Sequence, residues 1–123
     1  MPGDVTLPRK RVTGETVEER LTANARERIL PARYLLRDED GEILETPAEM
    51  FERVAGAVAS AEDDPGTWSD RFYELLTGLE FLPNSPTLMN AGGPLGQLAA
   101  CFVLSPDDDL DDIFDTVRQA ARV

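Results

Sequence analysis

The chain has 123 residues, enough for one small domain with a modest hydrophobic core. Asp and Glu number 24 against 12 Lys and Arg, and the resulting net charge of −12 repels phosphate backbones, which argues against direct binding of DNA or RNA. No apolar run approaches the ~20 residues needed to span a bilayer, and the first residues carry no secretory signal. We therefore expect a cytoplasmic protein that does not contact membranes.

The chain has no histidine and a single cysteine, Cys101. This composition excludes, within the chain, a zinc site built from Cys and His, an intramolecular disulfide, a Ser-His-Asp triad and a Cys-His pair. No metal site is expected. Any chemistry must rest on Cys101, on carboxylates, on the backbone or on residues that this chain lacks.

Residues 1–16 show no periodicity and are expected to form a flexible arm. Apolar residues that recur every four positions predict an amphipathic helix over 17–30, which Pro31 limits. Two short apolar pieces on either side of Asp40-Gly41 predict a hairpin.

The strongest helix signal begins at Thr46. This residue can cap a helix, and Glu49 completes a Thr-x-x-Glu capping box. The apolar pattern then predicts a helix of about 15 residues that ends before the breakers at 63–66. A further amphipathic helix is predicted to start at Thr67 and to close by Pro83.

The pattern changes after residue 80. Residues 81–96 contain three prolines and three glycines, so a loop rather than a helix is predicted. Residues 97–104 alternate between two largely apolar faces, which predicts a buried strand that carries Cys101. The residues around Asp107 predict the cap of a last helix. That helix has no stop signal, which together with an unpartnered strand suggests a fragment.

Residues 81–104 closely resemble the start of the catalytic barrel in class II, adenosylcobalamin-dependent ribonucleotide reductases. The motifs are FLPNSPTLMNAG at 81–92 and LGQLAACFVL at 95–104. Upstream, RYLL at 33–36 and ETPAEMFERVA at 45–55 resemble the helical N-terminal region of that family, and DDIFDTV at 111–117 resembles the helix after the first barrel strand. The resemblance extends from about Leu21 to the end of the chain.

The resemblance implies a mostly α fold, in which a helical N-terminal domain leads into the first strand and helix of a ribonucleotide reductase α/β barrel. The expected divisions are a flexible arm at 1–16, the helical domain at 17–82 and the incomplete barrel at 83–123. The whole enzyme would convert ribonucleotides to deoxyribonucleotides for DNA synthesis by radical chemistry. Adenosylcobalamin would be bound by the full enzyme and not by this segment alone.

The implied partners are a ribonucleotide substrate, a deoxynucleotide or ATP effector, a thioredoxin-type reductant and the remainder of the reductase, in a homodimer when complete. By resemblance, Cys101 is a catalytic residue, one of two redox-active cysteines that reduce the ribose and end as a disulfide. Its partner cysteine and the thiyl-radical cysteine are absent from this chain, so the isolated chain is expected to be inactive. Without the family context, Cys101 would be taken for a small core residue.

The resemblance assigns two groups of binding residues. Ser85, the backbone of Ala100 and Cys101 would bind the substrate, with the Ser85 hydroxyl on its phosphate. Asp108, Asp109 and Leu110 would bind the allosteric effector, with the Asp108 carboxylate on a sugar hydroxyl. On local chemistry alone, Ser85 is a turn residue and the aspartates are helix caps.

Two alternatives remain open. The first is a non-catalytic helical interaction module that retains an ancestral reductase motif. The second is a thiol redox protein that acts through Cys101 alone, although the chain has no Cys-x-x-Cys motif. The sequence also leaves open whether the substrates are diphosphates or triphosphates.

Overall fold

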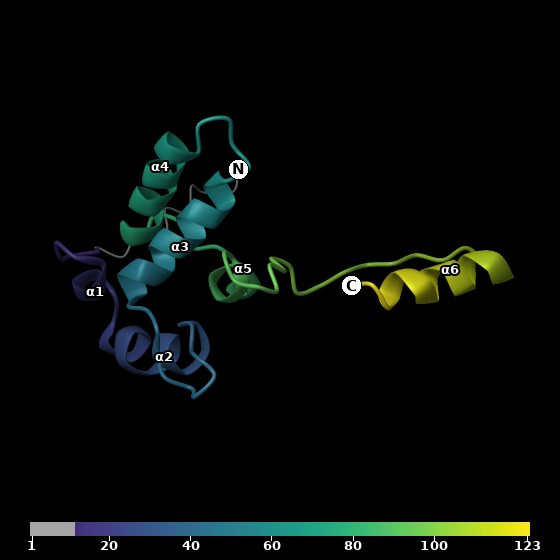
Figure 1. Ribbon diagram of the computed structural model, residues 1–123, viewed down its shortest axis with the longest axis horizontal. Helices are drawn as coiled ribbons and strands as arrows, with labels where there is room; N and C mark the ends of the chain where they lie inside the picture. Colours follow the sequence, from purple (N-terminus) through teal and green to yellow (C-terminus); the bar gives the residue numbers. More distant parts are fainter. Residues whose placement is uncertain (1–11) are drawn as a thin grey trace, which may run out of the picture.

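The computed structural model describes residues 12–123; the first eleven residues of the predicted arm lie outside the described part. Helices dominate the described chain. In chain order they are α1 (Val17–Arg20), the π-helical turn η1 (Ala25–Ile29), α2 (Leu30–Arg33), α3 (Pro47–Ala59), α4 (Pro65–Thr77), α5 (Ser85–Asn90) and α6 (Leu110–Ala120). The elements from α1 to α5 form one body, and the chain after α5 leaves it to carry α6 well away from the body (Figure 1).

The core of the body is the pair of helices α3 and α4, which lie side by side (Figure 1). The predicted capping box starts α3: the Glu49 N–H donates to Thr46 Oγ1 at 3.2 Å, and the Thr46 N–H donates to Glu49 Oε2 at 2.7 Å. The buried face of α3 is the centre of the hydrophobic core, with Met50, Phe51 and Val54 almost wholly enclosed. The predicted helix at 46 is therefore confirmed, although α3 ends at Ala59.

The helix predicted over 17–30 is interrupted. α1 ends at Arg20, and Leu21 is extended, with φ −70° and ψ 144°. The chain becomes helical again at Ala23, just before η1, and passes through Pro31, so the prediction that Pro31 limits the helix was wrong. The wider π-helical turn immediately before Pro31 changes the hydrogen-bond register there, which accommodates a residue without an N–H inside the helical run.

The predicted hairpin around Asp40-Gly41 is present in a short form. Arg37 and Ile43 form an isolated antiparallel bridge, and the Leu44 N–H donates to Leu36 O at 2.8 Å. Gly41 has a φ of +85°, which glycine adopts without strain.

The prediction of a loop without a helix over 81–96 was wrong, because α5 forms there. The breakers lie where a helix accepts them: Pro86 is in the first turn of α5, and Pro94 and the glycines come after its end. Asn84 caps the helix by accepting the Thr87 N–H at 3.0 Å. α4 likewise begins earlier than predicted, at Pro65, because Asp64 caps it.

The buried strand predicted over 97–104 does not form. The described residues contain no β-strand, and this segment runs extended and exposed between α5 and α6 (Figure 1). Val103, for example, is 92% exposed. A strand needs a neighbour to accept its hydrogen bonds and cover its side chains, and no such neighbour lies within 12–123.

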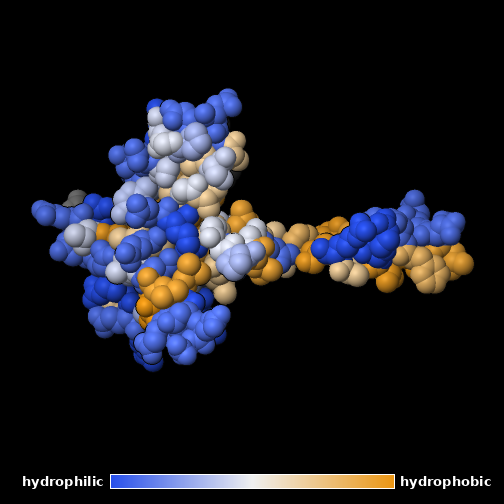
Figure 2. All heavy atoms as spheres, viewed as in Figure 1, coloured by the Kyte–Doolittle hydropathy of each residue, from blue (hydrophilic) through white to orange (hydrophobic). Residues whose placement is uncertain are grey.

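The last helix forms where it was predicted, with Asp109 as its cap. α6 turns back along the extended segment, so that Gln97 Nε2 donates to the backbone oxygen of Val123 at 3.2 Å. Its apolar side chains, among them Leu110, Phe114 and Val117, remain exposed. Figure 2 shows hydrophobic surface along one edge of α6 and hydrophilic surface along the other. Among the described residues, no helix is long and apolar enough to cross a membrane.

Candidate functional site

Ser85 occupies the first position of α5, at the surface of the body. Its hydroxyl lies 2.8 Å from the hydroxyl of Tyr34, which follows α2. Either hydroxyl can donate in this pair, so the second one keeps a free donor or acceptor for a ligand. The structure therefore places a second hydroxyl beside the predicted phosphate contact, from a residue 51 positions away in the sequence.

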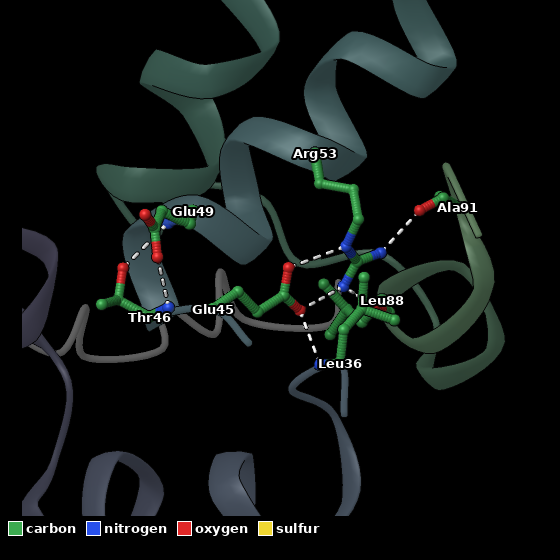
Figure 3. Close-up of polar contacts among 7 residues, drawn as sticks. All are labelled: Leu36, Glu45, Thr46, Glu49, Arg53, Leu88 and Ala91. Carbon is green, nitrogen blue, oxygen red and sulfur yellow. Dashed lines mark hydrogen bonds and ion pairs between the residues drawn. The ribbon is translucent and has the colours of Figure 1, made fainter. Parts of the chain in front are cut away.

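A buried ion pair between Arg53 and Glu45 holds α5 on the body (Figure 3). Arg53 lies on α3, and its guanidinium donates to both carboxylate oxygens of Glu45, at 2.9 Å and 2.7 Å. The same guanidinium donates to the backbone oxygens of Leu88 at 3.0 Å and Ala91 at 2.5 Å, at the C-terminal end of α5. Glu45 also accepts the Leu36 N–H at 2.9 Å. This network joins the hairpin, α3 and α5 around one centre.

Gly92 permits the close approach of α5 to Arg53. Its φ is +75°, and a Cβ at this position would lie 2.9 Å from Cγ of Arg53. Any other residue would both strain the backbone and push the Arg53 side chain away from the carbonyls that it binds. The glycine that ends the FLPNSPTLMNAG motif is therefore required by packing.

Cys101 and Ala100 lie on the exposed segment that leaves α5. No hydrogen bond in the described part of the chain joins either of them to Ser85. Three side chains at α5 bind the backbone of this segment at Gln97 and Leu98 instead. Within residues 12–123, α5 thus connects Ser85 to the segment that carries Ala100 and Cys101, with no hydrogen bond between Ser85 and Cys101.

The predicted effector residues lie together at the start of α6. Asp109 caps the helix by accepting the Asp112 N–H at 3.2 Å, and Leu110 is its first residue. Asp108, immediately before the cap, is exposed. α6 lies well away from α5 in Figure 1, so the effector candidates are separated from Ser85. Between residues 12 and 123, no three or more Cys, Asp or Glu side chains are placed so that they could hold a metal ion together.

Comparison with known proteins gives the family of this chain. Residues 13–96 match the family described as "Ribonucleotide reductase, all-alpha domain", a range that includes Ser85 and ends before Cys101. The vitamin B12-dependent ribonucleoside-diphosphate reductase of Mycobacterium tuberculosis is 53% identical over 100 residues, which cover 77% of this chain and 14% of that protein.

Two further relatives agree. A protein of the same name from Thermoplasma acidophilum is 33% identical over 174 aligned positions, which cover 93% of this chain and 22% of that protein. The ribonucleoside-diphosphate reductase subunit alpha of Helicobacter pylori is 36% identical over 89 residues, which cover 72% of this chain and 11% of that protein. This chain thus spans less than a quarter of the length of each of these relatives. It belongs to the ribonucleotide reductase family, with the N-terminal all-alpha domain of the vitamin B12-dependent, class II type.

Proposed function

We propose that this chain acts as the N-terminal part of a ribonucleotide reductase that converts ribonucleoside diphosphates to deoxyribonucleotides, for DNA synthesis in the cytoplasm. The observation that carries the proposal is the 53% identity with a vitamin B12-dependent ribonucleoside-diphosphate reductase over 77% of the chain. The choice of diphosphates follows the names of the relatives. The proposed divisions are the arm at 1–16, the helical domain at 17–82 and the start of the barrel at 83–123.

The proposed chemical role of this chain is to supply one reducing thiol, Cys101. Reduction of the ribose replaces a C–OH bond by C–H and releases water, which consumes two electrons and two protons. Two cysteine thiols supply both when they form a disulfide, and a thioredoxin-type dithiol then restores them by exchange. Cys101 is a free thiol in this chain, as a reducing cysteine must be before turnover. The remainder of the enzyme would supply the partner cysteine and the thiyl radical.

The proposed role of α5 is to bind the substrate phosphate. Ser85 would donate its hydroxyl to a phosphate oxygen, and the backbone of Ala100 would contribute beside it. Tyr34 supports this assignment, because its hydroxyl lies 2.8 Å from that of Ser85 and can take over as the hydrogen-bond partner when Ser85 turns to the ligand. A hydroxyl suits this role because it can donate a hydrogen bond to a phosphate oxygen.

The proposed cofactor of the whole enzyme is adenosylcobalamin, which supplies the radical when bound. This chain has no histidine, the commonest protein ligand for a metal, to offer to the cobalt. We therefore assign cobalamin to the remainder of the reductase. Asp108, Asp109 and Leu110 would bind a deoxynucleotide or ATP effector in the complete, homodimeric enzyme, and the isolated chain would be inactive.

The test is Cys101→Ser in the full-length reductase that contains this sequence. We expect multiple turnover with a thioredoxin-type reductant to be abolished, because serine cannot form the disulfide, while the denaturation midpoint stays close to that of the parent. A purely structural cysteine predicts the opposite, with stability reduced and turnover per folded molecule retained. Normal turnover in the folded variant would contradict the proposed redox role of Cys101. The chain would then be part of an active reductase without supplying one of its reducing thiols.

A further inference from the structure

We propose that Asn84, Thr87 and Asn90 form a clamp that fixes the position of the Cys101 segment relative to Ser85. They would be positioning residues, since none of them touches the reacting atoms. The catalytic consequence rests on the function proposed above, whereas the mechanical role of the clamp rests on contacts within this chain alone.

The clamp consists of three hydrogen bonds to two neighbouring backbone carbonyls. Asn84 Nδ2 donates to Leu98 O at 3.0 Å, and Thr87 Oγ1 donates to the same oxygen at 3.2 Å. Asn90 Nδ2 donates to Gln97 O at 2.8 Å. The Leu98 carbonyl thus uses both of its lone pairs on α5 side chains. No strand neighbour binds these carbonyls within 12–123, so the clamp replaces the hydrogen bonds that a sheet would supply.

The spacing of the clamp residues places them along one side of α5. They follow one another at intervals of three residues, and side chains three apart are neighbours on a helix surface. Asn84 serves twice, because its Oδ1 accepts the Thr87 N–H and caps the helix while its Nδ2 holds Leu98. Fixing the helix start and fixing the segment are therefore coupled through one side chain.

The positions of the clamp hydrogen bonds along α5 show the direction in which the Cys101 segment runs past this helix. Gln97 is bound at the C-terminal end of α5 by Asn90, and Leu98 is bound at the N-terminal end by Asn84 and Thr87. The segment therefore passes α5 toward the end that carries Ser85. Cys101 follows Leu98 by three residues, a reach of about 10 Å in an extended chain.

The clamp has a rigid base. Arg53 binds the Leu88 and Ala91 carbonyls of α5 and is itself paired with Glu45, and the Arg53 and Glu45 side chains are only 12% and 8% exposed. Residues placed by a rigid scaffold keep reacting groups in register, and a displacement of 1 Å in an active site can cost about a hundredfold in rate. The clamp is thus the link through which the helical body sets the place of the thiol.

The test measures the position of Cys101 in this chain. Cys101 is the only cysteine, so one added cysteine, Ser60→Cys at the exposed end of α3, allows a pair of nitroxide labels and a distance distribution by pulsed EPR. We expect one narrow distance peak in the parent and loss of that peak in Thr87→Val/Asn90→Asp. Thr87→Ser, which restores the hydroxyl, should keep the narrow peak.

Two single variants provide a second test and a matched control in case the double variant does not fold. Asn84→Asp retains an oxygen that caps α5 and removes the donor to Leu98, so it should broaden the peak even if the double variant fails to fold. Asn24→Asp makes the same chemical change at an asparagine whose side chain makes no capping bond, and it should leave the peak narrow. A narrow peak in the folded clamp variants, unchanged from the parent, would refute the clamp.

The effect of the clamp on catalysis is measured in a separate experiment. In the full-length reductase, the clamp variants should lower kcat about a hundredfold with the denaturation midpoint preserved. If Cys101→Ser retains normal turnover while the EPR peak still broadens, the proposed redox function fails and the clamp stands. If the peak does not broaden but Cys101→Ser is inactive, the clamp fails and the proposed function stands.

Discussion

Replacing Arg53 by methionine would test whether the buried ion pair holds the body together. Methionine keeps much of the length and apolar volume of arginine but has no donors. The change would leave the Glu45 carboxylate, 8% exposed, without its cation, and the Leu88 and Ala91 carbonyls would lose the hydrogen bonds that anchor α5. Glu45 would keep only the Leu36 N–H.

The loss of stability in Arg53→Met should be large, because the substitution removes only one member of the buried ion pair. Removing one partner of a buried pair costs about 3–5 kcal/mol, since a charge is left buried and uncompensated. This is a substantial part of a typical domain stability of roughly 5–15 kcal/mol. Replacing both Arg53 and Glu45 by methionine should recover much of the loss, because no unpaired charge remains.

The measurement is the free energy of unfolding from urea denaturation, followed by the fluorescence of Trp68, the only tryptophan, and by circular dichroism. The matched control is Arg118→Met on α6. Arg118 pairs with Asp115 at the surface, where the two side chains are 55% and 40% exposed, and loss of such a pair costs under about 1 kcal/mol. If Arg53→Met destabilises the chain no more than Arg118→Met, the buried network does not hold the body together.

Two further predictions concern local features. Hydrogen bonds from the Thr67 hydroxyl and N–H lower the pKa of Asp64 below its usual value of 3.8, so its stabilisation of α4 is present above that pH and is lost as the pH falls through the lowered pKa. An asparagine side chain caps a helix without titrating, so thermal melts between about pH 5 and pH 2 should show a smaller acid loss in Asp64→Asn, but not in Asp63→Asn. Gly92→Ala should destabilise more than Gly41→Ala in the same melts: both glycines have positive φ, but only at position 92 would a Cβ meet a side chain. Equal losses would mean that the contact with Arg53 is unimportant.

The parts of the fold that the sequence predicted are those fixed by neighbouring residues. The capping box at Thr46 and Glu49 joins residues three apart, and the Asp40-Gly41 turn needs only its own backbone conformation. The break after α1 was not predictable in this way. Arg20 there donates to the Thr77 carbonyl at 2.9 Å, a contact across 57 positions that no local pattern records.

The number of prolines and glycines at 81–96 led to the wrong prediction of a loop where α5 forms. Their positions relative to the helix ends matter more than their number. Asn84 followed by Pro86 in the first turn is a good helix start, and the glycines all come later. The spacing Asn-x-x-Thr-x-x-Asn also carried a readable signal, since three polar side chains on one side of a short helix suggest that they bind something. Their target, the backbone at 97 and 98, required the structure.

The site residues likewise divide into those that the sequence identified and those that depend on contacts between distant parts of the chain. Ser85 and Cys101 came from the family resemblance, whereas Tyr34 could not have been linked to Ser85 from the sequence, because 51 positions separate the two hydroxyls. The Arg53 network could not be predicted from the sequence either. Its carbonyl partners lie 35 and 38 positions away, and every residue type has a backbone carbonyl, so the sequence does not indicate which ones Arg53 binds.

The disagreement at 97–104 supports the proposed function. The sequence there alternates between two apolar faces, as in a strand covered on both sides, yet the structure leaves the segment exposed and the apolar face of α6 uncovered. Apolar side chains are stabilising only when they are buried, so this pattern fits a larger surface than residues 12–123 provide. The relatives are several times longer than this chain, and the remainder of such a reductase would supply that surface in our proposal. The clamp on α5 would then hold the segment ready, in register with Ser85, before its neighbours cover it.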